Sequence, residues 1–277
     1  MGPRGCHPWR VSVAFFPYGD PELEAYGVRL LATVSRLLRE QMEPPELAFV
    51  PVGPGFAYEA CPELFAGRRG YGPLDVVFDT NLLIDYFQHG RALWEGESLV
   101  GELGEYGEEL EALQVVFAIW VIRELRFHVL PRVLVDAKRR LSHERFAERA
   151  NALDNFAAAL GLVGSEADET PPSSRAQALK GNAGFLGVLG RVPAEDRPLV
   201  SDAVELDAHV FLTRDRGVLA CRQALRPFGL LIATPGDLLE QLSACGALHC
   251  VLVPETAYWP LPDQARVAHL ISALPTD

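Results

Sequence analysis

The stretch that decides the fold is Leu74-Asp75-Val76-Val77-Phe78-Asp79-Thr80-Asn81-Leu82-Leu83-Ile84-Asp85-Tyr86-Phe87. Val76 to Phe78 is a short apolar run with two β-branched residues, as in a strand buried on both faces. A polar corner, Asp79-Thr80-Asn81, follows, and apolar residues then continue at helical spacing to Phe87. We predict a strand, a corner and a helix, with Asp79 at the sheet edge where open α/β folds bind ligands. Asp79 and Thr80 also suit simple capping of the helix, so this stretch alone leaves both roles open.

The composition of the whole chain limits the class of protein. The chain has 277 residues, 49% of them hydrophobic, and a formal net charge of −12. A sizeable core can form, and the acidic balance argues against a protein that coats nucleic acid. The five cysteines are scattered without a Cys-x-x-Cys pair, so we expect reduced thiols in a cytoplasmic protein. The apolar stretch 11–16 is too short for a signal peptide and no later run reaches membrane-spanning length, so we expect no membrane partner.

A second informative stretch runs from Glu195 to Gly217. Glu195-Asp196 precede Pro198, a pattern typical of a helix start, since acids and proline are favoured in the first turn. Residues 209–212 then predict a strand, followed by Thr213-Arg214-Asp215. A second strand thus ends in an acid, as the first does at Asp79.

The region between these stretches contributes one more acid and a basic segment. We expect a strand over 114–119 and a helix beginning near Trp120, in which Glu124 shares an apolar face with Val121, Leu125 and His128. A carboxylate on such a face is costly unless something satisfies it. A basic helix is predicted over about 132–160. It carries Arg139, Arg140 and Arg145, and a solvated face is the simplest interpretation of its charge.

The remaining segments predict the organisation of the chain. Residues 9–17, 21–40 and 46–52 indicate a strand–helix–strand extension, joined by a Gly/Pro-rich link over 53–73. The acid-rich segment 95–111 is expected to be a solvated loop entering a helix. Further elements are predicted at 175–189 (helix), 229–233 (strand), 235–243 (helix capped from Thr234), 248–253 (strand) and 264–274 (helix). We therefore divide the chain into an accessory region (1–73), a main α/β domain (74–243) and a C-terminal extension (244–277).

These motifs together resemble the PIN domain family of metal-dependent nucleases. The matching pieces are Val77 to Ile84, Val121 to Leu125, Asp196 opening a helix, and Val210 to Leu219, so the resemblance covers about residues 74–240. It implies a central parallel sheet flanked by helices, with Asp79, Glu124, Asp196 and Asp215 converging at one edge. It also implies Mg²⁺- or Mn²⁺-dependent endoribonuclease activity. Many members are toxins of toxin–antitoxin pairs, but the extra regions of this chain depart from the compact toxins.

The expected chemistry rests on the carboxylates. Mg²⁺ and Mn²⁺ prefer oxygen ligands, and such ions supply charge neutralisation and an activated water for phosphodiester hydrolysis. Asp79, Glu124, Asp196 and Asp215 are the predicted catalytic metal ligands. Thr80, Asn81 and Thr213 are expected to bond the carboxylates or a phosphate, and Arg139, Arg140 and Arg145 to bind RNA. We prefer Asp196 to Asp202, which lies about 9 Å further along the helix axis and off the buried stripe.

Three alternatives remain open at this point. A PIN-like module could bind RNA or a protein without cutting, although the presence of all four acids argues against it. A haloacid-dehalogenase-like phosphatase would need a second Asp at position 81, which is Asn. A DNA-directed 5′ nuclease relative is compatible with the same residues. An antitoxin-like inhibitor, another protein partner and self-association also stay open.

Overall fold

Four parallel strands form the central sheet of the computed structural model, which describes residues 32–34, 36–37, 53–120, 123–141, 144–163, 173–247 and 264–275. In spatial order the strands are β4 (Leu125–His128), β3 (Leu74–Phe78), β5 (Val210–Leu212) and β6 (Leu231–Ala233). β3 and β5, the strands of the two motifs, are direct neighbours, with Val76 opposite Val210 and Phe78 opposite Leu212. The predicted α/β class with a central parallel sheet is confirmed.

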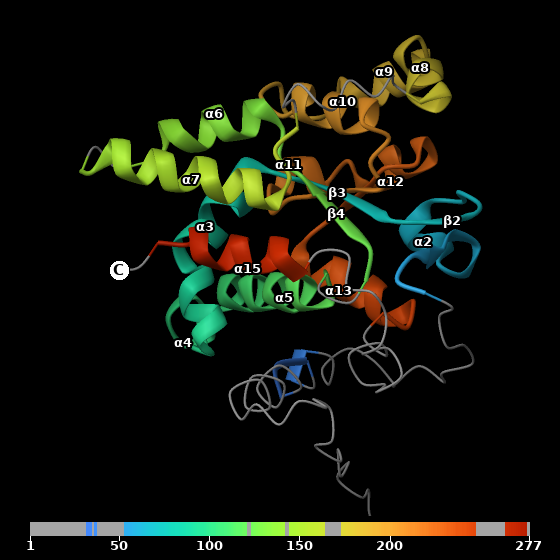
Figure 1. Cartoon of the computed structure of the whole chain (residues 1–277). Helices are drawn as coiled ribbons and strands as arrows, with labels where there is room; N and C mark the ends of the chain where they lie inside the picture. The colour runs from blue at the N-terminus through green and yellow to red at the C-terminus, as the bar shows by residue number, and fades with distance from the viewer. Residues whose placement is uncertain are drawn as a thin grey trace, which may run out of the picture.

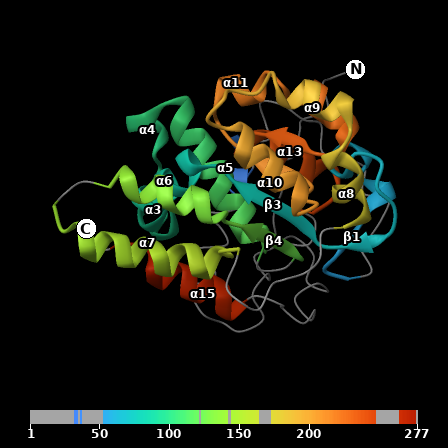
Figure 2. The ribbon, with the colours of Figure 1, turned by 90° about the horizontal axis from the view of Figure 1, so that it is seen from above.

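Helices cover both faces of this sheet, which explains why its strands are apolar runs without alternation. Figure 1 shows α5 (Glu105–Trp120) and α13 (Pro235–Ala244) on one side and α10 (Arg197–Glu205) on the other. Figure 2 looks onto the side that carries α10. All three residues of β5 and all but Asp75 of β3 are buried.

The other elements connect or flank these layers. They are α3 (Thr80–Glu95), α4 (Val100–Leu103), α6 (Pro131–Arg139), α7 (Phe146–Leu160), α8 (Ser174–Lys180), α9 (Ala183–Leu189), α11 (Arg216–Leu219), α12 (Arg222–Leu225), η2 (Arg226–Phe228) and α15 (Gln264–Ala273). Within the described part of the chain, no helix combines the length and apolar character needed to cross a bilayer.

The predicted strand over 114–119, followed by a helix from Trp120, is wrong. Residues 105–120 form one helix, α5, in which every residue from Leu110 to Trp120 is buried. A helix enclosed on all sides lacks the polar stripe that reveals helical periodicity, so its apolar run is indistinguishable from a buried strand. The strand follows instead at Leu125–His128, where buried and more exposed residues alternate.

Two predicted helices are each divided in the structure. The basic segment forms α6 and α7, with Pro131 at the first position of α6, where its missing N–H is tolerated. The segment 175–189 forms α8 and α9, and the Asn182 side chain caps α9 by accepting from the Phe185 N–H at 3.0 Å. The strand near 229–233 and the helix after Thr234 are confirmed. Thr234 and Asp237 form a capping box at the start of α13.

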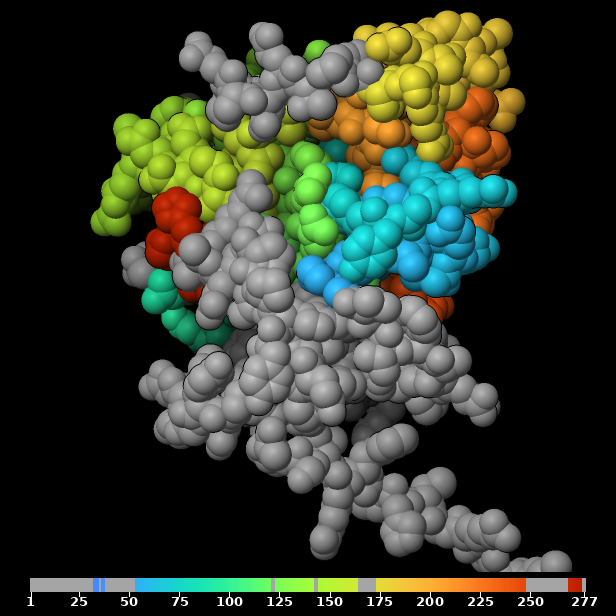
Figure 3. All heavy atoms as spheres, turned by 45° about the vertical axis from the view of Figure 1, so that its right-hand side comes forward, coloured from blue at the N-terminus to red at the C-terminus, as the bar shows by residue number. Residues whose placement is uncertain are grey.

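The Gly/Pro-rich link over 53–73 is a packed segment, not a simple connection. It contains β1 (Phe56–Ala57), η1 (Tyr58–Ala60), α2 (Pro62–Phe65) and β2 (Tyr71–Gly72), with β1 and β2 antiparallel. Phe56, Leu64 and Phe65 belong to the same core as the central sheet. Arg68 donates to the carbonyls of Asp207 and Ala208, both at 2.8 Å. Figure 3 shows this blue-to-cyan segment on the surface beside the yellow α8 and α9.

Three of the predicted strands, at 9–17, 46–52 and 248–253, lie outside the described residues. Within the helix predicted over 21–40, residues 32–34 and 36–37 are described and are helical. The helix predicted over 264–274 corresponds to α15.

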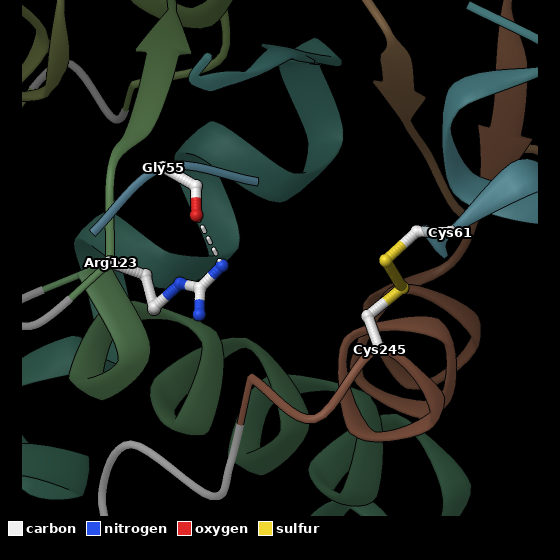
Figure 4. Close-up of a disulfide and its surroundings, with 4 residues drawn as sticks. All are labelled: Gly55, Cys61, Arg123 and Cys245. Carbon is white, nitrogen blue, oxygen red and sulfur yellow. Dashed lines mark hydrogen bonds between the residues drawn. A yellow bond between two sulfur atoms is a disulfide. The ribbon is translucent and has the colours of Figure 1, made fainter. Parts of the chain in front are cut away.

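A disulfide joins Cys61, at the start of α2, to Cys245, at the end of α13 (Figure 4). Their Cα atoms are 5.6 Å apart, within the range that a disulfide requires. Near the same segment, buried Arg123 donates to the Gly55 carbonyl at 2.6 Å and lies over the Phe56 ring. The expectation of reduced thiols is therefore wrong for this pair. Cys61 and Cys245 are 184 residues apart in the sequence, so only the tertiary fold brings them together. Cys221 is free and buried.

Asp75 in β3 is held between two histidines. His128 Nε2 lies 2.9 Å from one carboxylate oxygen, and His209 Nδ1 lies 3.3 Å from the other and accepts the Asp75 N–H at 3.0 Å. Burial opposes ionisation of Asp75, but its contacts with His128 and His209 hold its pKa well below its ordinary value. Burial lowers the pKa of His209, and Arg68 adds to this against the attraction of Asp75 and Asp207.

We predict that the disulfide contributes about 2 to 5 kcal/mol to the free energy of unfolding, as expected for closing a long loop. Cys61→Ser and Cys245→Ser should each lower the urea midpoint, and the double variant should lose no more than either single one. Reductant should destabilise the wild type and leave the variants unchanged. An effect of reductant on Cys61→Ser equal to that on the wild type would contradict this account.

The His209 site predicts a loss of stability in mild acid. Its folded pKa lies below the ordinary value of about 6.5, so the unfolded chain binds the proton first. The contribution of His209 to the free energy of unfolding is therefore fully present above the ordinary pKa of the unfolded chain. It is lost as the pH falls toward the lowered pKa of the folded state. His209→Asn retains an acceptor for the Asp75 N–H but does not titrate. Between about pH 7.5 and about pH 5.5, the wild type should therefore lose more unfolding free energy than the variant. Equal losses would show that His209 is not the sensitive group.

Candidate functional site

The two polar corners meet because β3 and β5 are paired in parallel. Asp79 follows Phe78 directly, Thr213 follows Leu212, and these two strand ends lie opposite each other. The Asp79 N–H donates to the Leu212 carbonyl at 3.0 Å, and the Thr213 N–H donates to the Ala233 carbonyl at 2.9 Å. Both corners are therefore fixed at the carboxyl edge of the sheet, where open α/β folds place ligands.

The Thr213 hydroxyl connects the two corners. It donates to Asp79 Oδ2 at 2.7 Å and accepts the Asp215 N–H at 3.0 Å. The other Asp79 oxygen accepts the Thr80 N–H at 2.6 Å, so Asp79 caps the 16-residue helix α3. Only 4% of Asp79 is exposed. Capping and placement at the sheet edge, the two roles that its sequence context left open, are thus combined in one side chain.

Asp215 is held in a similar way at the start of α11. Its Oδ1 accepts the N–H groups of Gly217 and Val218 at 2.7 and 3.1 Å. Gly217 also determines what can lie beside this turn, because a Cβ there would be 2.7 Å from Pro193. Since no side chain intervenes, the turn containing Pro193 packs against the Asp215 loop. The Asp196 N–H donates to the Pro193 carbonyl at 3.0 Å, so Asp196 is carried on that same turn.

Asp196 belongs electrostatically to the same group as Asp79 and Asp215. The pKa of Asp196 is raised to about 6. Burial is the largest cause, and the nearby Asp79 and Asp215 carboxylates contribute to the same rise. Burial also raises the pKa of Asp79, to which Asp215 adds, against the hydrogen bonds from Thr213 and Thr80. Asp202 lies among other charges: Arg132 Nε is 3.9 Å from its carboxylate. The structure thus brings together Asp79, Asp196 and Asp215, which we call the aspartate cluster.

Glu124 lies at the opposite end of the sheet, and its predicted place in the site is wrong. Its carbonyl accepts the N–H of Leu74, the first residue of β3, at 2.9 Å, whereas Asp79 follows the last residue. Its carboxylate pairs with Arg126 at 2.9 Å. The error follows from the helix that was expected to begin near Trp120. The segment instead forms the strand β4, and Glu124, which precedes its first residue, cannot reach the carboxyl edge.

Of the three predicted basic residues, Arg140 lies next to the aspartate cluster. Arg140 follows the last residue of α6 and its guanidinium donates to the Asn81 side-chain oxygen. Its charge opposes the rise in the pKa of both Asp79 and Asp196. Arg139 is 74% exposed and pairs with Asp136, and Arg145 is exposed at the start of α7. Neither has a contact that ties it to the aspartate cluster among those identified in the described residues.

The donor chemistry of the aspartate cluster fits a hard divalent cation such as Mg²⁺ or Mn²⁺. Its members are carboxylates, which such ions prefer, and neighbouring negative charges that raise one another's pKa would be stabilised by a cation. In the described residues, however, no three His, Cys, Asp or Glu side chains are spaced as a formed metal centre. Binding of an ion by all three aspartates would therefore require these side chains to rearrange.

Sequence reasoning missed Arg214, which lies between Thr213 and Asp215. Its side chain contacts Asp85 on α3 and Tyr106 on α5. Its place inside the Thr-Arg-Asp corner was the only signal in the sequence, because its partners are more than 100 residues away.

The chain was also compared with known proteins. No protein-family model, curated protein or solved structure matches it.

Proposed function

We propose that this protein is a Mg²⁺- or Mn²⁺-dependent nuclease that hydrolyses phosphodiester bonds in RNA. The observation that carries the proposal is the aspartate cluster, to which three separate loops each contribute a carboxylate at the carboxyl edge of one parallel sheet. The motifs around these residues are the ones that resemble the PIN domain. RNA as the substrate rests on that resemblance alone, so DNA is an alternative arm of the test.

In this proposal Asp79, Asp196 and Asp215 would hold the ion, which when bound would neutralise phosphoryl charge and activate a water. Thr213 fixes the rotamer of Asp79 and the backbone of Asp215 through its bridging hydroxyl. Thr80 contributes its backbone N–H, which holds the second Asp79 oxygen. Arg140 would pair with a substrate phosphate, and its guanidinium is held by the Asn81 side-chain oxygen.

The second candidate is a non-catalytic module that binds RNA or a protein. The position of Glu124 favours this candidate. A complete set of four converging acids would favour catalysis, and three of the four acids converge. It predicts retained RNA binding without cleavage under any metal condition.

The first test compares Asp79→Asn with Glu124→Gln, two changes that each remove one charge and preserve size. We expect Asp79→Asn to reduce Mn²⁺-dependent cleavage at least about 100-fold, because a ligand and the shared electrostatic site are lost. Glu124→Gln, at the other end of the sheet, should retain cleavage near the wild-type rate. Cleavage of labelled RNA and DNA would be measured with Mn²⁺ and with EDTA. Undiminished cleavage by folded Asp79→Asn would sink the proposal.

The second test contrasts two aspartates of one helix region. Asp196→Ala should strongly reduce cleavage, because Asp196 shares the field of Asp79 and Asp215. Asp202→Ala should change it little, since its nearest charged partner is Arg132. Both single-turnover cleavage and Mn²⁺ affinity would be measured, with thermal unfolding as a check on folding. The reverse ranking of the two variants would remove Asp196 from the site.

A further inference from the structure

Arg214 is held by two different contacts, one with Asp85 and one with Tyr106. Its guanidinium carbon lies 3.6 Å from the centre of the Tyr106 ring, and its Nη2 lies 3.0 Å from Asp85 Oδ2. The Arg214 and Asp85 side chains are 29% and 20% exposed, so this pair is far less hydrated than a surface ion pair. Partly desolvated cation–π and charge-assisted contacts are stronger than their exposed counterparts.

These contacts connect the site loop to two helices. Asp85 lies on α3, the helix that Asp79 caps, and Tyr106 lies in the first turn of α5. Burial raises the pKa of Tyr106, and the neighbouring Asp85 carboxylate adds to the rise. The phenol therefore stays neutral and acts on Arg214 through its ring.

A second contact from α5 holds the next loop of the same edge. Glu109, one turn beyond Tyr106, accepts the Gly236 N–H at 2.8 Å where α13 begins after β6. The β6 end is in turn bonded to Thr213, whose N–H donates to Ala233. The first turns of α5 thus brace the loops after both β5 and β6. The segment 95–111, expected to be a solvated loop entering a helix, contains the end of α3, all of α4 and the start of α5, and its α5 part supports the site.

We propose that Arg214 is a positioning residue that sets the Thr213–Asp215 loop by clamping it to Tyr106 and Asp85. The inference rests on the proposed nuclease function and identifies a group that acts through other residues. The flanking Thr213 hydroxyl bonds both Asp79 and Asp215, so displacement of this loop changes the placement of these two aspartates relative to each other. Misplacement of reacting groups by about 1 Å can cost roughly 100-fold in rate.

The test is a double-mutant cycle on Arg214→Met and Tyr106→Leu. Each variant keeps an apolar side chain in place while removing the cation or the aromatic face. We expect kcat to fall between about 10-fold and about 100-fold in each, with KM unchanged because the proposed role of Arg214 is to hold the loop and not to contact the substrate. The double variant should lose no more than the worse single variant, since both changes break one clamp. Arg214→Lys, which can keep the pair with Asp85, should recover part of the loss.

Arg91→Met is the matched control. It removes an arginine from α3 that is paired with Glu95 at 2.7 Å, away from the loop, and should leave kcat at the wild-type value. Rates would be normalised to folded protein, so a purely structural role would appear as a lower unfolding temperature with unchanged kcat. That result, or strictly additive losses in the cycle, would overturn the positioning role.

Mn²⁺ affinity in the absence of nucleic acid separates this inference from the function on which it rests. Wild-type protein that binds Mn²⁺ but cleaves neither RNA nor DNA would overturn the nuclease proposal alone. Arg214→Met should then still bind Mn²⁺ several-fold more weakly, because Asp79 and Asp215 lose their relative placement. Affinity and kcat both equal to those of the wild type would overturn the role of Arg214.

Discussion

The parallel pairing of β3 with β5 is the constraint on which the rest of the site depends. It places Phe78 opposite Leu212, so the next residues of both strands emerge side by side at one edge. The Asp79 N–H continues the ladder to Leu212, and the Thr213 hydroxyl then joins the two corners. Shifting this register by a single residue would turn the paired side chains toward the opposite face and disrupt their packing against the helices on both sides of the sheet. Packing of the core therefore fixes the strand register, and this register places Asp79 beside the corner that carries Asp215.

Gathering carboxylates at this edge is unfavourable by itself, and the surrounding groups show how the cost is reduced. Asp79 accepts two hydrogen bonds, which favour its charged form, and Asp215 accepts two backbone N–H groups that fix its carboxylate. Asp196 is half-buried, and its pKa is raised to about 6. Arg140 supplies the neighbouring positive charge. The negative charge of the three aspartates that Arg140 does not balance would be neutralised by a bound cation or by a basic partner.

The support of the site comes from distant parts of the chain. Arg214 reaches Tyr106 and Asp85, and Glu109 reaches Gly236, so α5 contacts both loops of the carboxyl edge. At the other end of the sheet, Asp75 with its two histidines and the packed segment 56–72 hold the strand starts. The Cys61–Cys245 disulfide ties that segment to the end of α13, whose beginning lies beside the site. Both ends of the sheet are therefore fixed by contacts between residues remote in sequence.

The sequence by itself determined the strand–corner–helix at Asp79, the strand ending in Thr213-Arg214-Asp215, and Asp196 as an acid opening a helix. These are local patterns in which apolar runs, capping residues and proline act within a few residues. Tertiary structure alone decided that α5 is a helix, that Glu124 lies at the wrong end of the sheet, and that Cys61 meets Cys245. Burial of residues 110–120 of α5 on all sides removes the periodic signal of a helix, and the resulting error in assigning this segment misplaced Glu124. Arg214 and its partners likewise depend on packing between elements, which no local pattern of residues records.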